Sequence, residues 1–445
     1  MKRAAAQAAG LGFAALLLLA AVPAGAATIT IMNANGAGVG FNDPTPVTPV
    51  TGNAGTTLGQ QRLNVFMAAA AYWSNRLVST VPITVTAQMI PLTCTPTSAL
   101  LGSAGPTDFW SDFVHAPRNA TWFPSALANA LALSDLDNAT PEISARFNTS
   151  LDNVPTCLSG IHWYYGIGGP APANTIPYYQ TVLHEIAHGL GFLTIVDLTT
   201  GGLAQGQTGP PMDDDFELFL ENHSTGKKWP QMTNAERLAS SLDTGDLHWT
   251  GPSVVAASSV LTGGRHPSGH VRMYAPSTLE PGSSVSHWDT VVTPDELLEP
   301  FATPSPLDLL TTHLLNDIGW SLQPTACLES TDTACLQLGR FEVKVTWQTA
   351  SSTGSGHVMA FNGPRAEGDE SVFWWFFSPT NFEMGVKVLN ACSFNGKYWV
   401  YLSGLTDQGW TVHVRDSKTG ANQVYTNALG HLSSTFADTS AFNCP

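Results

Sequence analysis

Charged residues are scarce in this sequence, and positively charged residues are the scarcest. Of 445 residues, 18 are Lys or Arg and 34 are Asp or Glu, so the formal net charge is −16 at neutral pH. A chain with so few cations has little basic surface to offer to phosphate groups. Nucleic acids and anionic membranes are therefore not expected as partners.

Closely spaced cysteine pairs are also missing, because none of the six cysteines belongs to a CxxC motif. This excludes zinc ribbons and thioredoxin-type redox motifs. Six cysteines in an exported protein are instead typical of structural disulfides, which persist in an oxidising compartment. Their order along the chain suggests the pairs Cys94–Cys157, Cys327–Cys335 and Cys392–Cys444, although many other connectivities are possible.

Long apolar runs are absent except at the N-terminus, where Leu11–Val22 follows Lys2 and Arg3. Ala24-Gly25-Ala26 then provides the small residues that signal peptidase prefers. The run is short for a membrane span. We therefore expect residues 1–26 to be a cleaved signal peptide and the mature protein to be secreted, without a membrane span.

Residues 27–322 mix helical and strand patterns. Apolar residues recur at helical spacing over Gln60–Leu77 and alternate with polar residues over Ile83–Ala87, which predicts a helix followed by a strand. A first strand is expected at Thr28–Met32, and Ile161–Tyr165 is predicted to be the edge strand of a sheet. These patterns favour an α+β fold with a mixed sheet.

Residues 327–445, which follow a predicted linker at residues 323–326, are expected to be all-β. Strand-like alternation separated by Gly, Asn and Asp is typical of a β-sandwich. Strands are predicted at Phe341–Trp347, Val372–Phe377, Phe382–Leu389, Tyr398–Leu402, Thr411–Val414 and Gln423–Tyr425. The aromatic residues are expected to fill a core rather than bind glycans. The pattern resembles a small β-domain appended to many exported bacterial proteins, a resemblance that implies no function.

The segment from Tyr178 to about Leu190 is predicted to be a helix and contains the motif HExxH. His184 and His188 are four residues apart, so they lie on one helix face and can bind a single zinc ion. Glu185 is then positioned as a general base for a zinc-activated water. The alternative is an ordinary helix whose histidines are satisfied by hydrogen bonds.

The spacing alone does not identify a third zinc ligand. A continuous HExxHxxGxxH motif would place a histidine at position 194, but that residue is Thr194, a poor ligand. A solvated loop is the expectation for the acidic cluster Asp213–Asp215, with a calcium site as its alternative. The candidates for the third ligand are Glu217, Glu221, His223, His248, His266, His270 and His287.

Three separated motifs together resemble the leishmanolysin-like branch of the metzincin peptidases. They are HExxHxxGF, the distant Ser286-His287-Trp288, and Asp295-Glu296-Leu297-Leu298-Glu299-Pro300. The similarity covers most of Ile29–Trp320, and Leu309–Trp320 is similar to the closing helix of the family. The resemblance implies a metzincin-type zincin domain, which consists of a mixed sheet and a central zinc helix.

The same resemblance implies the chemistry. His184, His188 and His287 would bind one catalytic Zn²⁺, and Glu185 would act as the base of a secreted endopeptidase that cleaves protein or peptide substrates. The chain departs from the family at Leu298, where metzincins have a methionine that forms an apolar floor below the metal. Leucine has a similar volume and should fill that role.

Two other functions are compatible with the residues. One is a zinc-binding surface protein that serves adhesion and has lost its activity, which Leu298 and the β-domain suggest. The other is a zinc amidase that acts on non-protein amides. No cysteine switch is expected, because the first predicted strand begins directly after the signal peptide and no cysteine lies between them.

Overall fold

The computed structural model describes residues 25–167, 171–206, 209–303, 306–323, 327–337, 339–359 and 370–444. Almost all of the predicted signal peptide and most of the predicted linker lie outside these ranges. Within the described ranges, no helix is long and apolar enough to cross a membrane.

The N-terminal part of the chain is built on a 4-stranded mixed sheet with the strand order β1-β2-β6-β3. The strands are β1 (Ile29–Asn33), β2 (Ile83–Ile90), β6 (Ile143–Asn148) and β3 (Gly102–Pro106). The first three are parallel to one another, whereas β3 is antiparallel to β6 and forms one edge. In β2, buried and half-buried residues alternate, as its sequence pattern predicts.

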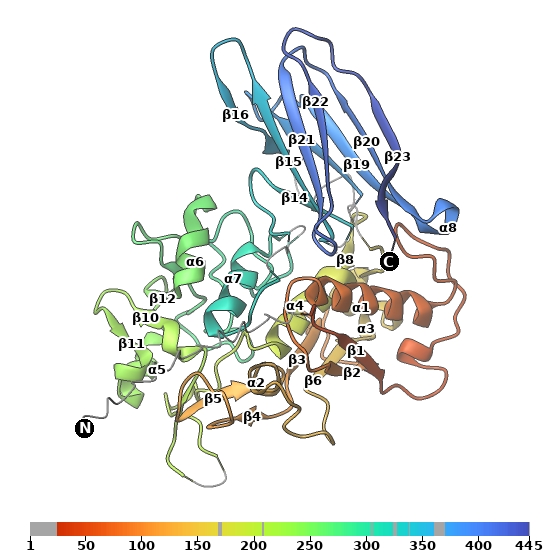
Figure 1. Cartoon of the computed structure of the whole chain (residues 1–445). Coiled ribbons are helices and arrows are strands. Elements are labelled where there is room, and N and C mark those ends of the chain that lie inside the picture. Colours follow the sequence, from red (N-terminus) through yellow and green to blue (C-terminus); the bar gives the residue numbers. More distant parts are fainter. Residues whose placement is uncertain are drawn as a thin grey trace, which may run out of the picture.

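Two helices, α1 (Leu58–Ser74) and α4 (Tyr178–Gly189), pack against each other, and α4 also contacts β3 and β6 (Figure 1). Two tryptophans donate hydrogen bonds to the backbone of α4, one at its middle and one just after its last residue. Trp73 of α1 donates a hydrogen bond to the carbonyl oxygen of Leu183 (3.1 Å), and Trp320 donates one to that of Leu190 (2.8 Å). Trp320 follows α7 (Leu309–Ile318), so α4 is fixed by the elements on both sides of it in the sequence.

The chain between α4 and α7 forms a 4-stranded sheet with the order β11-β10-β12-β13, on the left of Figure 1. Its strands are β10 (Leu220–Asn222), β11 (Lys227–Lys228), β12 (Leu247–Trp249) and β13 (Val271–Arg272). Helices α5 (Asn234–Ser240) and α6 (Pro252–Ala257) belong to the same region. The remaining short elements are β4 (Phe109–Trp110), β5 (Thr121–Pro124), α2 (Ser125–Ala132), α3 (Ser150–Asn153), β7 (His162–Tyr164), β8 (Thr175–Pro177) and β9 (Asp213–Asp214).

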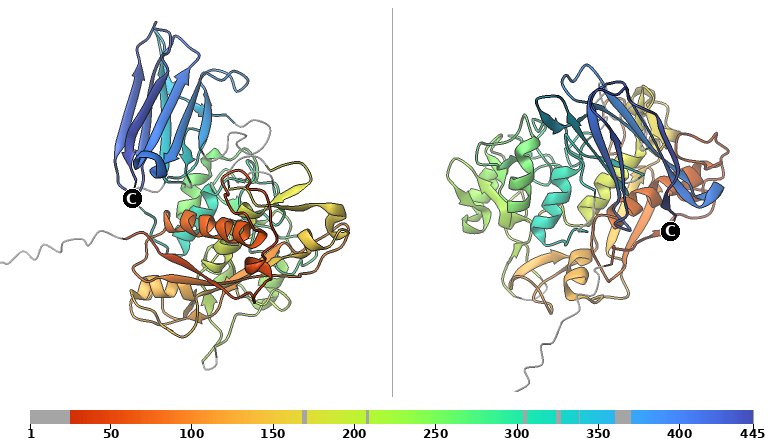
Figure 2. Two further views of the ribbon diagram at one scale, coloured as in Figure 1. Left: turned by 90° about the vertical axis from the view of Figure 1, so that its right-hand side faces the viewer. Right: turned by 45° about the horizontal axis from the view of Figure 1, so that its top comes forward.

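The C-terminal part consists of two antiparallel sheets that share one hydrophobic cluster (Figures 1 and 2). The first contains β14 (Ala334–Leu336), β15 (Phe341–Gln348), β16 (Thr353–Ser355), β21 (Gly409–Asp416) and β22 (Asn422–Asn427). The second contains β17 (His357–Val358), β18 (Ser371–Trp375), β19 (Met384–Ala391), β20 (Lys397–Gly404) and β23 (Phe436–Asn443). Phe341, Trp374 and Trp410 are buried in this cluster, so aromatic residues do fill a core, whereas Phe377 is exposed.

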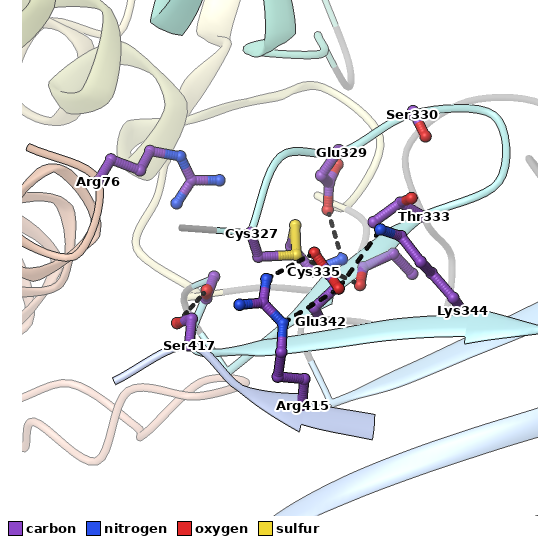
Figure 3. Close-up of a disulfide and its surroundings, with 12 residues drawn as sticks. Arg76, Cys327, Glu329, Ser330, Thr333, Cys335, Glu342, Lys344, Arg415 and Ser417 are labelled. Carbon is purple, nitrogen blue, oxygen red and sulfur yellow. Dashed lines mark hydrogen bonds and ion pairs between the residues drawn. A yellow bond between two sulfur atoms is a disulfide. The ribbon is translucent and has the colours of Figure 1, made fainter. Parts of the chain in front are cut away.

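All six cysteines are paired, and the three pairs are those suggested by the sequence: Cys94–Cys157, Cys327–Cys335 and Cys392–Cys444. Figure 3 shows the Cys327–Cys335 disulfide, with Arg76 nearby. Arg76 is fully buried at the end of α1, and its Nε atom lies 3.0 Å from a carboxylate oxygen of Asp308. A Cβ atom on Gly339 would lie 2.3 Å from the Arg76 guanidinium, so the backbone of the C-terminal part packs directly against Arg76.

The α+β architecture agrees with the sequence, and the predicted edge strand is present. Residues His162–Tyr164 form β7, but this strand belongs with β8 to a separate 2-stranded sheet and not to the main sheet. The edge of the main sheet next to α4 is β3, whose sequence GSAGP contains no apolar alternation. Its small residues let α4 approach the sheet closely. Because these residues do not alternate between apolar and polar, the sequence pattern does not predict the strand.

Replacing Gly189 by alanine should destabilise the fold, although alanine is the better helix former. A Cβ atom at position 189 would lie 2.4 Å from Cγ2 of Ile143 in β6, so α4 would have to move off the sheet. We expect a loss of about 1–3 kcal/mol in the free energy of unfolding, measured by urea denaturation. Gly36→Ala is the control, since nothing lies within 4 Å of its added Cβ. Equal stability of the two variants would contradict this packing.

Candidate metal centre

Three histidine side chains from two distant parts of the chain converge on one point. His184 and His188 lie one turn apart on α4, and His287 comes from the loop between β13 and α7. The Nε2 atom of His184 lies 3.1 Å from that of His188 and 3.2 Å from that of His287. The third distance, between His188 and His287, is 3.3 Å. This group can hold a metal ion.

The other ring nitrogen of each histidine contacts a backbone carbonyl oxygen. Nδ1 lies 2.7 Å from the oxygen of Leu297 in His184, and 2.7 Å from that of Phe192 in His188. In His287 it lies 2.8 Å from the oxygen of Ser283. A carbonyl oxygen only accepts hydrogen bonds, so each Nδ1 carries the proton. Each Nε2 therefore has a free lone pair, and the three lone pairs point at the same place.

Burial keeps the three rings neutral. It lowers the pKa of His184 to about 3 and that of His188 to about 4, and the pKa of His287 falls well below its usual value. The neighbouring rings lower the pKa values of His184 and His287 further, because a second positive charge would be repelled. Neutral imidazole is the form that binds metal ions, so these side chains are in the ligating state at neutral pH.

Glu185 lies between α4 and the edge strand β3. Its side chain is buried, and the backbone amide of Ala104 donates a hydrogen bond to its carboxylate. Burial is the stronger effect and raises the pKa of Glu185 to about 8. Gly102 leaves room for the carboxylate, since a Cβ atom there would lie 3.1 Å from Oε1 of Glu185.

The turn at residues 295–300 contacts the histidines from another side. Leu297 supplies the carbonyl oxygen for His184, and the carbonyl oxygen of Leu298 accepts a hydrogen bond of 2.8 Å from the amide of Trp288. Glu296 is buried and accepts a hydrogen bond of 2.9 Å from the amide of Leu310 at the start of α7. The Leu298 side chain is fully buried and belongs to the hydrophobic core of the N-terminal part.

Position 194 has a structural role. The hydroxyl of Thr194 donates a hydrogen bond of 2.6 Å to Asp214, and its amide donates one of 3.2 Å to the hydroxyl of Ser286. Thr194 therefore ties the chain after α4 to the neighbour of His287. Among the described residues, the other candidates for the third ligand do not join this group, and Glu221, His223 and His270 gather elsewhere.

The acidic cluster is buried, so the predicted solvated loop was wrong. Asp214 and Asp215 are each 2% exposed, and Glu217 is 0% exposed. The amide of Glu217 donates a hydrogen bond of 2.7 Å to Asp214, which also accepts one from Ile195. The cluster is therefore a buried part of the frame that follows α4.

The chain matches no protein-family model, no curated protein and no solved structure. The resemblance to leishmanolysin-like peptidases thus stays a prediction from motifs. The geometry of the three histidines and Glu185 is the independent observation from which a function can be inferred.

The buried carboxyl of Glu217 should make the fold less stable as pH rises. Burial, reinforced by the nearby Asp214, raises its pKa from 4.5 to about 10. Between about pH 5 and pH 10 the folded state then keeps a proton that the unfolded state releases. Stability falls through this window, by at most about 1.4 kcal/mol per pH unit. Glu217→Gln should flatten the dependence in urea denaturation at pH 5 and pH 8.5, whereas an unchanged slope would contradict the shift.

Proposed function

We propose that this protein is a secreted zinc endopeptidase of the metzincin type, with His184, His188 and His287 as the metal ligands and Glu185 as the general base. The observation that supports the proposal best is the convergence of three Nε2 lone pairs beside a buried glutamate on one helix. Two of these ligands and the glutamate belong to HExxH, and the third comes from the motif that the family resemblance indicated.

The donor set suits zinc. Three neutral imidazoles and an open fourth position are a common arrangement of catalytic zinc sites. The hydrogen bonds from each Nδ1 to a carbonyl oxygen orient the rings and raise their basicity, as outer-shell partners do in zinc enzymes. When bound there, zinc would polarise a substrate carbonyl and lower the pKa of a water molecule toward about 7.

Glu185 would accept a proton and later donate it during the reaction. In its ionised form, Glu185 would accept a proton from the attacking water while the water oxygen bonds to the carbonyl carbon of the substrate. It would then transfer that proton to the nitrogen of the leaving amine as the C–N bond breaks. The amide of Ala104 and the space left by Gly102 hold the carboxylate in position.

The position of the edge strand β3 favours a peptide as the substrate. β3 ends the mixed sheet on the side of α4, and its Ala104 contacts Glu185. An extended peptide that adds to this edge by backbone hydrogen bonds would be held beside the catalytic residues. Nothing lies within 4 Å of a Cβ atom placed on Gly105, so the face of the strand is open at this residue. A small non-protein amide would make no use of such an edge, which favours the peptidase over the amidase.

Disulfides support secretion. Three cystines persist where thiols are oxidised, as they are outside the cell. An inactive adhesion protein would need no base, yet Glu185 is intact and positioned. We therefore favour an active secreted enzyme.

Glu185→Gln should abolish the cleavage of an unfolded protein substrate and leave the zinc content unchanged. Glutamine keeps the shape but cannot accept the proton, and loss of a general base costs about 10²–10⁴-fold in rate. Cleavage is followed by gel electrophoresis and zinc by mass spectrometry, with Glu370→Gln on the exposed surface as the control. Zinc binding without cleavage by the unmutated chain would favour adhesion or the amidase, and full activity of Glu185→Gln would exclude the assigned base.

Leu298→Met should change activity only slightly. Leu298 is fully buried and contributes no donor atom, and methionine has nearly the same volume. We expect the rate of cleavage to stay within about 3-fold and the fold to lose less than about 1.5 kcal/mol. A gain of more than tenfold in kcat would show instead that leucine impairs the enzyme.

A further inference from the structure

A second group of histidines lies in the region between His188 and His287. The ligand atoms of Glu221, His223 and His270 all lie within 4.8 Å of one another. Two further histidine rings pack beside them. The ring of His266 has its centroid 3.9 Å from that of His223, and the ring of His248 lies 4.7 Å away.

The sheet β11-β10-β12-β13 brings these residues together. Leu220 of β10 is fully buried in the core, and the next residue, Glu221, faces the opposite side because side chains alternate along a strand. Glu221 is paired with His248 across the β10–β12 ladder, so the two side chains share that face. His223 follows β10 directly, at the end of the strand.

A tight turn supplies the other two histidines. The amide of His266 donates a hydrogen bond of 2.9 Å to the carbonyl oxygen of His270, and the amide of Gly269 donates one of 2.8 Å to that of His266. Gly269 has a φ angle of 92°, which glycine adopts at no steric cost. The turn thus holds His266 and His270 at its two ends, and His270 leads into β13.

The distances within the group are those of ligands that surround one ion. Nδ1 of His223 and Nδ1 of His270 each lie 3.2 Å from Oε1 of Glu221. His270 Nδ1 is a buried atom without a hydrogen-bond partner among the described residues, because its approach to Glu221 lacks hydrogen-bond geometry. Oε1 of Glu221 also takes part in a hydrogen bond of 3.2 Å with Nδ1 of His223, which a cation bound among the three ligands would replace. The buried nitrogen of His270 is available to that cation.

We propose that Glu221, His223 and His270 bind a second divalent transition-metal ion, with zinc as the expected metal. Two imidazoles and one carboxylate form a donor set that suits zinc. The side chains are partly buried, 12% exposed for Glu221, 27% for His223 and 23% for His270, so an ion can reach them from solvent. The rings of His248 and His266 pack against the ring of His223.

This second ion would support the third ligand of the first centre. His270 is followed by Val271 and Arg272 of β13, and the carbonyl oxygen of Arg272 accepts a hydrogen bond of 3.0 Å from the amide of Asp289. The side chains of Arg272 and Asp289 also form an ion pair at 3.0 Å. Two residues further along, the amide of Tyr274 donates a hydrogen bond of 2.8 Å to the carbonyl oxygen of His287. The second ion therefore anchors the strand that pairs with the segment around His287.

The test counts zinc ions per chain and does not use activity. The full secreted chain is loaded with zinc, dialysed, and measured by inductively coupled plasma mass spectrometry. We expect two ions in the unmutated chain, one in the variant His184→Ala/His188→Ala, and none when His223→Ala/His270→Ala is added. His413→Ala/His431→Ala, which changes two exposed histidines of the C-terminal part, is the matched control and should keep both ions.

Absence of zinc from the variant His184→Ala/His188→Ala would overturn the proposal, as would retention of that ion after His223→Ala/His270→Ala is added. Glu221→Gln provides a milder change in case the addition of His223→Ala/His270→Ala prevents folding. In the His184→Ala/His188→Ala background, it should weaken Co²⁺ binding at least tenfold in a spectroscopic titration, because the anionic ligand is lost. An unchanged Co²⁺ affinity would count against the site. Neither result bears on the peptidase proposal, which the Glu185→Gln experiment tests.

Discussion

Three hydrogen bonds from imidazole Nδ1 atoms to backbone carbonyl oxygens determine how the candidate metal centre is built. The acceptors lie at Phe192, Ser283 and Leu297, in three separate segments of the chain. Each acceptor fixes which ring nitrogen is protonated and where the other one points. The lone pairs converge only if all three segments are held in register with α4. Much of the N-terminal architecture can be understood as the frame that does this.

A small number of buried hydrogen bonds hold this frame together. Trp73 and Trp320 donate to α4 carbonyl oxygens, Asp214 accepts from Thr194 and the next amide, and Glu296 accepts from the start of α7. In a low-dielectric interior such bonds are strong, and an unpaired group there would be costly. They specify a single arrangement of the loops around the histidines, which an apolar core alone would leave less defined.

The sequence was most informative where chemistry depends on local spacing. HExxH placed His184, Glu185 and His188 on one helix, and the helix is α4. The strands of the C-terminal part also followed from local patterns, and the disulfide pairs agree with the suggestion from the order of the cysteines along the chain. The third histidine did not follow from a local pattern, because residues alone left Glu217, Glu221 and five histidines as candidates. His287 was singled out by resemblance, and three of the rejected candidates turned out to gather in a group of their own.

Tertiary pairing across β10, β12 and the 266–270 turn creates that group, and no sequence period records such pairing. The acidic cluster Asp213–Asp215 was misjudged because an acidic run suggests solvent, and no sequence pattern predicted β3, whose residues GSAGP lack apolar alternation.

The distance along the chain between the ligands has a thermodynamic consequence. An ion held by His188 and His287 would be a cross-link between positions 99 residues apart. Closing a loop of that size restricts the unfolded chain by an amount worth about 4.7 kcal/mol in the chain-entropy view of cross-links. A chelator that removes such an ion would thus remove a cross-link that stabilises the fold, together with the metal centre itself. Under the proposed function, metal supply would then set the lifetime of the protein as well as its turnover.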